Sequence, residues 1–184
     1  RQLTDSDSPS AQVRVEWRQA ERLHDIGRHT EAAELYAELW DTMLDRVPAM
    51  RRVRLSSMVR DMQQVARADA AAGTVFEQLR DRDTAAVHGG SATDEQITDW
   101  LHLNEVLDDQ AATVEWADKM VATPDGVILL QKFERDITEH AIVRARWDLV
   151  AAAVEDPVES AKQWLSIIER VDSATGERAI DWPI

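Results

Sequence analysis

The chain has 184 residues, 44% hydrophobic and 30% charged, with a formal net charge of −14 and no cysteine. This composition is typical of a globular domain that can bury a core, and it excludes a disordered or largely membrane-embedded chain. The absence of cysteine excludes a disulfide framework, a thiolate metal site and a cysteine nucleophile. No apolar run approaches the roughly 20 residues that span a bilayer, so we expect no membrane insertion by this segment.

Residue usage favours an all-α fold. Glycine and proline are scarce, with 6 and 5 copies, and aromatic residues make up 5% of the chain. Several of the most frequent residues, including alanine, arginine, glutamate and leucine, are strong helix formers. Because the chain begins at Arg1 instead of methionine, we expect it to be a piece of a longer or processed protein.

Charge is unevenly distributed along the chain. Up to Val87 there are 13 basic and 15 acidic residues, whereas beyond it there are 8 and 20. The acidic second part would repel phosphates, so we expect no nucleic-acid binding. The one basic cluster consists of Arg51, Arg52, Arg54 and Arg60. It is interpreted either as a partner-binding patch or as an ordinary solvated helix face.

The first predicted element is a helical hairpin at 13–47, which follows a flexible N-terminal segment at 1–11. Apolar residues of its first helix recur at spacings of three and four: Val13, Trp17, Ala20 and Leu23. Gly27 is expected to end this helix, because glycine readily adopts the left-handed conformation found after helix C-termini. Thr30 is expected to cap the second helix, which carries a wide apolar face.

More helices are predicted, within a single all-α domain at 12–172. Pro48 suits the first turn of a helix at about 49–72, and Gly73 marks a break before a weaker helix. The loop at 88–92 holds two glycines and coincides with the change in charge. If the domain at 12–172 divides into two subdomains, we therefore expect the division at this loop.

The second part of the chain continues the helical pattern. A hairpin turn is predicted at Asp108, and a stretch at 127–154 without helix breakers predicts one long helix or two stacked ones. A last helix is expected to begin near Asp156, and residues 173–184 form a C-terminal tail. The whole chain then contains about eight helices.

Small, glycine and aromatic residues occupy regular places in the first hairpin: Ala20, Leu23, Gly27, Ala32 and Tyr36. Through them the phrase DIGRHTEAAELY resembles the tetratricopeptide repeat, a helix–turn–helix unit of roughly 34 residues. The resemblance implies a short α-solenoid of stacked antiparallel hairpins, in which small residues let helices approach closely. It also implies that a peptide or a partner helix binds in a concave groove.

Two weaker copies of this pattern follow. In the first copy, Ala112 and Trp116 repeat the pair of a small and an aromatic residue. In the second, Ala161 is the small residue and Leu165 stands in the place of the aromatic one. Ala32 and Ala112 are 80 residues apart, and Ala112 and Ala161 are 49 apart, so no fixed period holds. A generic α-solenoid or an irregular helical bundle therefore remains the alternative fold.

Two histidines have carboxylates at helical spacing: His102 with Asp99 and Glu105, and His140 with Asp136. Such pairs would suit acid–base chemistry or a metal site. Neither forms an established ligand motif, and no nucleophile elbow or phosphate-binding glycine loop occurs. We therefore expect no enzyme activity, no catalytic or metal-binding residues and no cofactor. His24 and His29, which flank the first turn, are interpreted as polar turn residues.

The chain has seven tryptophans, against two phenylalanines and one tyrosine. Most are interpreted as packing anchors between helices, and Trp100 or Trp147 is alternatively expected to line a groove. The candidate partner-binding residues are therefore Trp100, Trp147, Arg51, Arg52 and Arg54.

The function predicted from these patterns is a non-enzymatic protein–protein interaction module. Its acidic second part favours a basic or neutral protein or peptide partner. One alternative is a helical ligand- or metal-binding domain that uses His102 or His140 with neighbouring carboxylates. Another is a structural oligomerisation domain, and the oligomeric state is left open.

Overall fold

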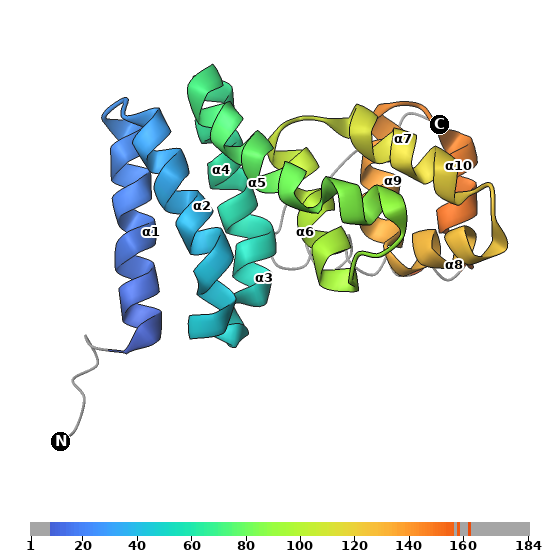
Figure 1. Cartoon of the computed structure of the whole chain (residues 1–184), viewed down its shortest axis with the longest axis horizontal. Coiled ribbons are helices and arrows are strands. Elements are labelled where there is room, and N and C mark those ends of the chain that lie inside the picture. Colours follow the sequence, from blue (N-terminus) through green and yellow to red (C-terminus); the bar gives the residue numbers. More distant parts are fainter. Residues whose placement is uncertain (1–7, 157, 159–161, 163–184) are drawn as a thin grey trace. The chain divides into compact units, whose positions relative to one another are not determined.

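Figure 1 shows the computed structural model of the chain, which describes residues 8–156 together with Val158 and Lys162. Every regular element within these residues is helical, which confirms the all-α prediction. The predicted helix after Asp156 lies outside the described residues, apart from Val158 and Lys162, which are both helical. The predicted tail at 173–184 lies outside them entirely. No helix in the described part is long and apolar enough to cross a membrane.

The helices are short to medium in length. They are α1 (Pro9–Asp25), α2 (His29–Arg46), α3 (Arg51–Val53), α4 (Val59–Ala68), α5 (Ala70–Gly89), α6 (Asp94–Val106), α7 (Gln110–Met120), α8 (Pro124–Lys132), α9 (Glu134–Val143) and α10 (Trp147–Ala153). A 3₁₀ turn at Pro48–Met50 precedes α3, and a π-helical turn at Arg54–Met58 joins α3 to α4. The chain forms two compact units, the first ending at Trp116 and the second beginning at Ala117.

The helices of the first unit pack in sequence order. Helix α1 packs against α2, α2 against α4 and α5, and α6 against α4 and α5 (Figure 1). Their shared core is built from the apolar faces expected from the sequence, and includes Val13, Trp17, Ala20, Ala32, Tyr36, Leu39, Met43, Met62, Phe76 and Leu103. The small residues Ala20, Ala32 and Ala33 are fully buried, so α1 and α2 can approach closely.

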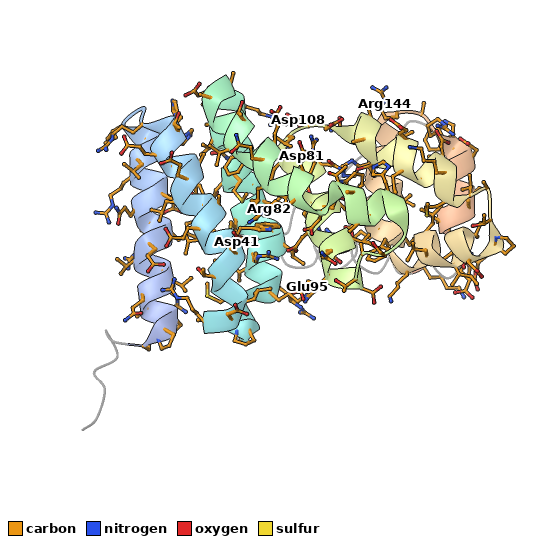
Figure 2. The ribbon with its side chains drawn as sticks, in the orientation of Figure 1. Asp41, Asp81, Arg82, Glu95, Asp108 and Arg144 are labelled. Carbon is orange, nitrogen blue, oxygen red and sulfur yellow. The ribbon has the colours of Figure 1, made fainter. Side chains whose placement is uncertain are left out.

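Ion pairs at the surface join the same helices. Arg46 of α2 donates to both carboxylate oxygens of Glu16 in α1, at 2.6 and 2.9 Å. Arg82 of α5 and Asp41 of α2 point toward each other (Figure 2) and form two hydrogen bonds, at 2.9 and 2.7 Å. Both pairs are partly exposed, so each is expected to contribute less than about 1 kcal/mol to stability.

One helix ends earlier than its sequence predicted. The helical run that includes α4 ends at Ala68, because Asp69 adopts an extended conformation with φ −151° and ψ 125°. The Asp69 carboxylate accepts a hydrogen bond from the backbone N–H of Ala71 at 3.0 Å and so caps α5. The predicted break at Gly73 is therefore wrong, since α5 continues through this residue.

Four helix ends share one turn geometry, in which the residue after the helix has a positive φ: Gly27, Gly90, Asp108 and Ala145. At the end of α1, Gly27 N–H donates to His24 O at 2.9 Å and Arg28 N–H donates to Leu23 O at 2.8 Å. This pair of bonds is the Schellman motif, which satisfies two of the free carbonyls at a helix end. The same two bonds, at equivalent positions, close the turns at Gly90, Asp108 and Ala145.

The second unit consists of short helices where the sequence predicted one long helix or two stacked ones. Thr123 Oγ1 accepts from Gly126 N–H at 3.1 Å and caps α8, which ends before Phe133. Helix α9 then ends at Val143, and α10 packs against both α8 and α9. At Gly126 a Cβ atom would clash with the backbone carbonyl of Met120, so only glycine permits this close approach.

The shared turn predicts opposite effects for two substitutions. A side chain in the left-handed region costs about 1–2 kcal/mol. Nothing lies within 4 Å of the Cβ that Gly27→Ala would add, so its effect is conformational alone. We expect Gly27→Ala to destabilise the protein by about 1 kcal/mol and Ala145→Gly to stabilise it by up to about that amount.

Urea unfolding of both variants beside the wild type measures these changes. The reverse signs, or no change in either midpoint, would contradict the left-handed assignment of the two residues.

Candidate functional site

Arg54 is a buried charged residue, with 4% of its surface exposed. Its two terminal nitrogens donate to the two carboxylate oxygens of Asp99 in α6, at 2.7 and 2.6 Å. Its Nε donates to the backbone carbonyl of Trp40 in α2 at 3.0 Å, and the guanidinium carbon lies 3.8 Å from the centre of the Trp40 ring. Arg54 therefore joins α2, the π-helical turn and α6, and its charge is not presented to solvent.

The other residues of the basic cluster lie at the surface. Arg51 and Arg52 are exposed, and Arg51 Nη1 lies 3.3 Å from Glu95 Oε1. Arg60 is also exposed. The structure thus separates Arg54 from its neighbours in sequence and leaves a smaller basic surface, partly neutralised by Glu95.

The two tryptophans predicted to bind a partner lie in different environments. Trp100 is 1% exposed, donates from Nε1 to Thr84 Oγ1 at 3.0 Å, and packs edge-on against Trp116 with ring centres 6.0 Å apart. Such contacts are those of a packing anchor between helices. Trp147 is 62% exposed at the start of α10, so its side chain is available to a partner.

Two exposed aliphatic residues accompany Trp147. Ile142 and Val143, the last residues of α9, are 50% and 69% exposed. Together with the exposed Arg144 they form the surface that we call the 142–147 surface (Figure 2 labels Arg144). The sequence predicted a helical stretch at 127–154 without a break near Ile142, whereas α9 ends at Val143.

Ion pairs hold the backbone of this turn. Arg146 Nη1 and Nη2 donate to the two carboxylate oxygens of Asp118 in α7, and Nε and Nη2 donate to those of Asp148 in α10. Hydrogen bonds from Arg146 lower the pKa of both carboxyls. Both acids therefore stay charged at neutral pH, and the turn stays tied to α7.

A half-buried carboxylate lies within the first unit. Trp17 Nε1 donates to Asp61 Oδ2 at 2.8 Å, which joins α1 to α4. Burial raises the pKa of Asp61, while the hydrogen bond from Trp17 opposes the change. Burial also raises the pKa of the neighbouring Tyr36, helped by the negative charge of Asp61. Sequence patterns gave no sign of this cluster, because its members come from three helices.

The histidine and carboxylate pairs expected from the sequence are only partly formed. His102 Nδ1 lies 2.9 Å from the carbonyl of Thr98, and both oxygens of Asp99 accept from Arg54 instead. His140 is buried. Among the described residues, no group of three or more His, Asp or Glu side chains is placed to hold a metal ion.

Comparisons of the chain with protein-family models, with curated proteins and with solved structures find no match. These comparisons therefore supply no substrate, partner or residue role. What the chain does has to be inferred from its own surfaces, and the 142–147 surface is the most distinctive of these.

A second prediction concerns the buried ion pair between Arg54 and Asp99. Arg54→Ala leaves Asp99 without its partner in a largely buried place, so we expect a loss of about 3–5 kcal/mol in the free energy of unfolding. The matched control Arg51→Ala removes an exposed pair from the same basic cluster and should cost less than about 1 kcal/mol. Urea unfolding measures both, and similar losses for the two variants would contradict the role given to Arg54.

The raised pKa of Asp61 predicts how the stability of the protein depends on pH. An acid whose folded-state pKa is raised contributes stability below its unfolded pKa and loses it as pH rises through the folded pKa. Asp61→Asn keeps an oxygen that can accept from Trp17 and does not ionise. The stability of this variant relative to the wild type should therefore increase as pH rises above about 3.9, the ordinary pKa of an aspartate carboxyl. A difference that stays constant across this range, measured by thermal unfolding, would show that Asp61 is not perturbed.

Proposed function

We propose that this chain is a non-enzymatic interaction module that binds a protein or peptide partner through the 142–147 surface. The observation that carries the proposal is the exposure of Trp147 beside two exposed aliphatic residues. The four other tryptophans in the described part of the chain, Trp17, Trp40, Trp100 and Trp116, are all buried. Tryptophan is strongly enriched among the residues that dominate binding energy at protein interfaces.

The turn geometry supports the view that Ile142 and Trp147 act together. Relative to the left-handed residue, Ile142 lies three residues before Ala145 and Trp147 lies two after it. His24 and His29 occupy the same two positions around Gly27, and there the two side chains are in direct contact, with ring centres 4.9 Å apart. We infer from this equivalence that Ile142 and Trp147 lie next to each other and form neighbouring parts of one contact surface.

As to architecture, we infer a tetratricopeptide-like array of helical hairpins. In the first unit each hairpin packs against the next one in sequence. Ala32 lies five residues after Gly27, and Thr113 lies five residues after Asp108; both are small residues and both are buried. This equivalence makes Thr113, instead of the adjacent Ala112, the counterpart of Ala32.

The partner is expected to be apolar at its centre and basic or neutral overall. Arg146 is neutralised by Asp118 and Asp148, so apolar contacts dominate at the turn itself. At longer range the excess of acidic residues beyond Val87, 20 against 8, attracts a basic partner. Association should then weaken as salt is added, because exposed charges are screened.

The proposal is tested by affinity capture from the cells that make the protein. The double variant Val143→Ala, Trp147→Ala should lose the captured partner, with a fall in affinity of about tenfold or more, as expected for loss of an interface anchor. The matched control Ile128→Ala removes an aliphatic residue that is equally exposed, at 65% against 69% for Val143, but lies on α8. It should leave the partner bound.

Two outcomes would contradict the proposal. One is a partner that binds the double variant and the wild type equally well. The other is the absence of any partner, combined with light scattering that shows self-association lost in the double variant. The second result would favour the oligomerisation alternative.

A further inference from the structure

The first hairpin turn brings two histidines together. His24, in the last turn of α1, and His29, the first residue of α2, have their Nδ1 atoms 3.0 Å apart. Their rings are tilted by 54° to each other, and both side chains are partly exposed. They are the only histidines among the described residues with an imidazole-to-imidazole contact. All five histidines of the chain lie in that part.

We propose that His24 and His29 form a two-ligand site for a divalent transition-metal ion that favours imidazole, such as Zn²⁺, Ni²⁺ or Cu²⁺. Imidazole nitrogens bind such ions at about 2.0–2.1 Å. Two ligands that subtend an angle of about 90–110° at the metal are therefore about 2.9–3.4 Å apart. The observed Nδ1 separation falls within this range, so a small rotation of the rings turns both lone pairs onto one ion.

The turn holds the two residues in place before any ion binds. The carbonyl of His24 accepts from Gly27 N–H, and the bond from Arg28 N–H to Leu23 O closes the motif. His29 then begins α2 directly, so its backbone is fixed by that helix. A site on such a rigid turn loses little conformational entropy when it binds a ligand.

The protonation states required are accessible. In the present contact either Nδ1 can be the donor, because the roles depend on the tautomers of the two rings. A metal ion needs a lone pair on both Nδ1 atoms, so the donating ring carries its proton on Nε2 instead. Each ring keeps one proton, and binding to two neutral rings releases no net proton.

The surroundings also suit a cation. The carboxylate of Asp61 is close enough to His24 to interact with it electrostatically, and Asp25 follows His24 directly in the sequence. The nearest basic residue in the turn, Arg28, is already paired with Glu31. No third protein ligand is placed at the pair among the described residues, so water completes the coordination and leaves the ion open to an outside ligand.

The test is isothermal titration of the full, tag-free chain with ZnCl₂, and separately with NiCl₂, at pH 7.5. We expect one saturable equivalent in the wild type. Removal of an outer-shell partner alone usually weakens metal binding 10–100-fold, so the single variants His24→Gln and His29→Gln should each weaken it by at least about tenfold. The double variant should show no saturable binding.

The matched control is His102→Gln, which removes another half-buried helical histidine and should bind as the wild type does. Circular dichroism confirms that each variant keeps its helix content. As a second readout, ring proton signals of His24 and His29, but not those of His102, should shift when Zn²⁺ is added. The proposal is overturned if the wild type shows no saturable binding at millimolar Zn²⁺, or if the double variant binds as tightly as the wild type.

Discussion

The contact between Arg54, Asp99 and Trp40 is the constraint on which the first unit depends. A guanidinium that is 4% exposed would be costly to bury unless its donors were satisfied. Here both terminal nitrogens and Nε have acceptors, and the flat face of the group lies on an indole ring. Three elements must be correctly aligned for this to happen, so the contact specifies their relative positions. An apolar residue could fill the space but would not select one alignment.

The π-helical turn is where this constraint acts on the backbone. A π turn adds a residue to one turn of a helix and so changes the face on which the following residues lie. Arg54 begins this turn and is buried, whereas Arg52 before it and Arg60 after it are exposed. Arg54 contacts α6 through Asp99, and the helix α4 that follows the turn packs against α5.

The features that could be predicted from sequence are those decided locally. The apolar stripe of α1 and the turn at Gly27 follow from spacing and from the conformational freedom of glycine, and both were found. Arg54 was misplaced because its carboxylate partner lies 45 residues away, and in sequence it looks like any member of a basic cluster. The sequence could not show which of Trp100 and Trp147 is buried and which is exposed, since both occupy helical apolar positions and only their tertiary packing differs.

Of the two left-handed turns formed by residues other than glycine, the one at Asp108 was predicted, and the one at Ala145 was not. Nothing in the sequence at 127–154 resembles a break, yet Ala145 adopts the left-handed conformation with φ 53°. That conformation has an energetic cost for alanine, and the two ion pairs of Arg146, the next residue, compensate for it at the same turn. These ion pairs stabilise the turn, and local propensity does not include the one with Asp118, which lies 28 residues away in the sequence.

The same turn links the two proposals. The turns after α1, α6 and α9 share one pattern of backbone hydrogen bonds, and in the first turn the residue three before and the residue two after the left-handed position are in contact. The first turn places His24 and His29 there, the second Glu105 and Gln110, and the third Ile142 and Trp147. The turns therefore differ in the side chains that they carry at these two positions: two imidazoles, a polar pair and an apolar pair. The two proposals together imply that substitutions at these two positions change what a turn binds.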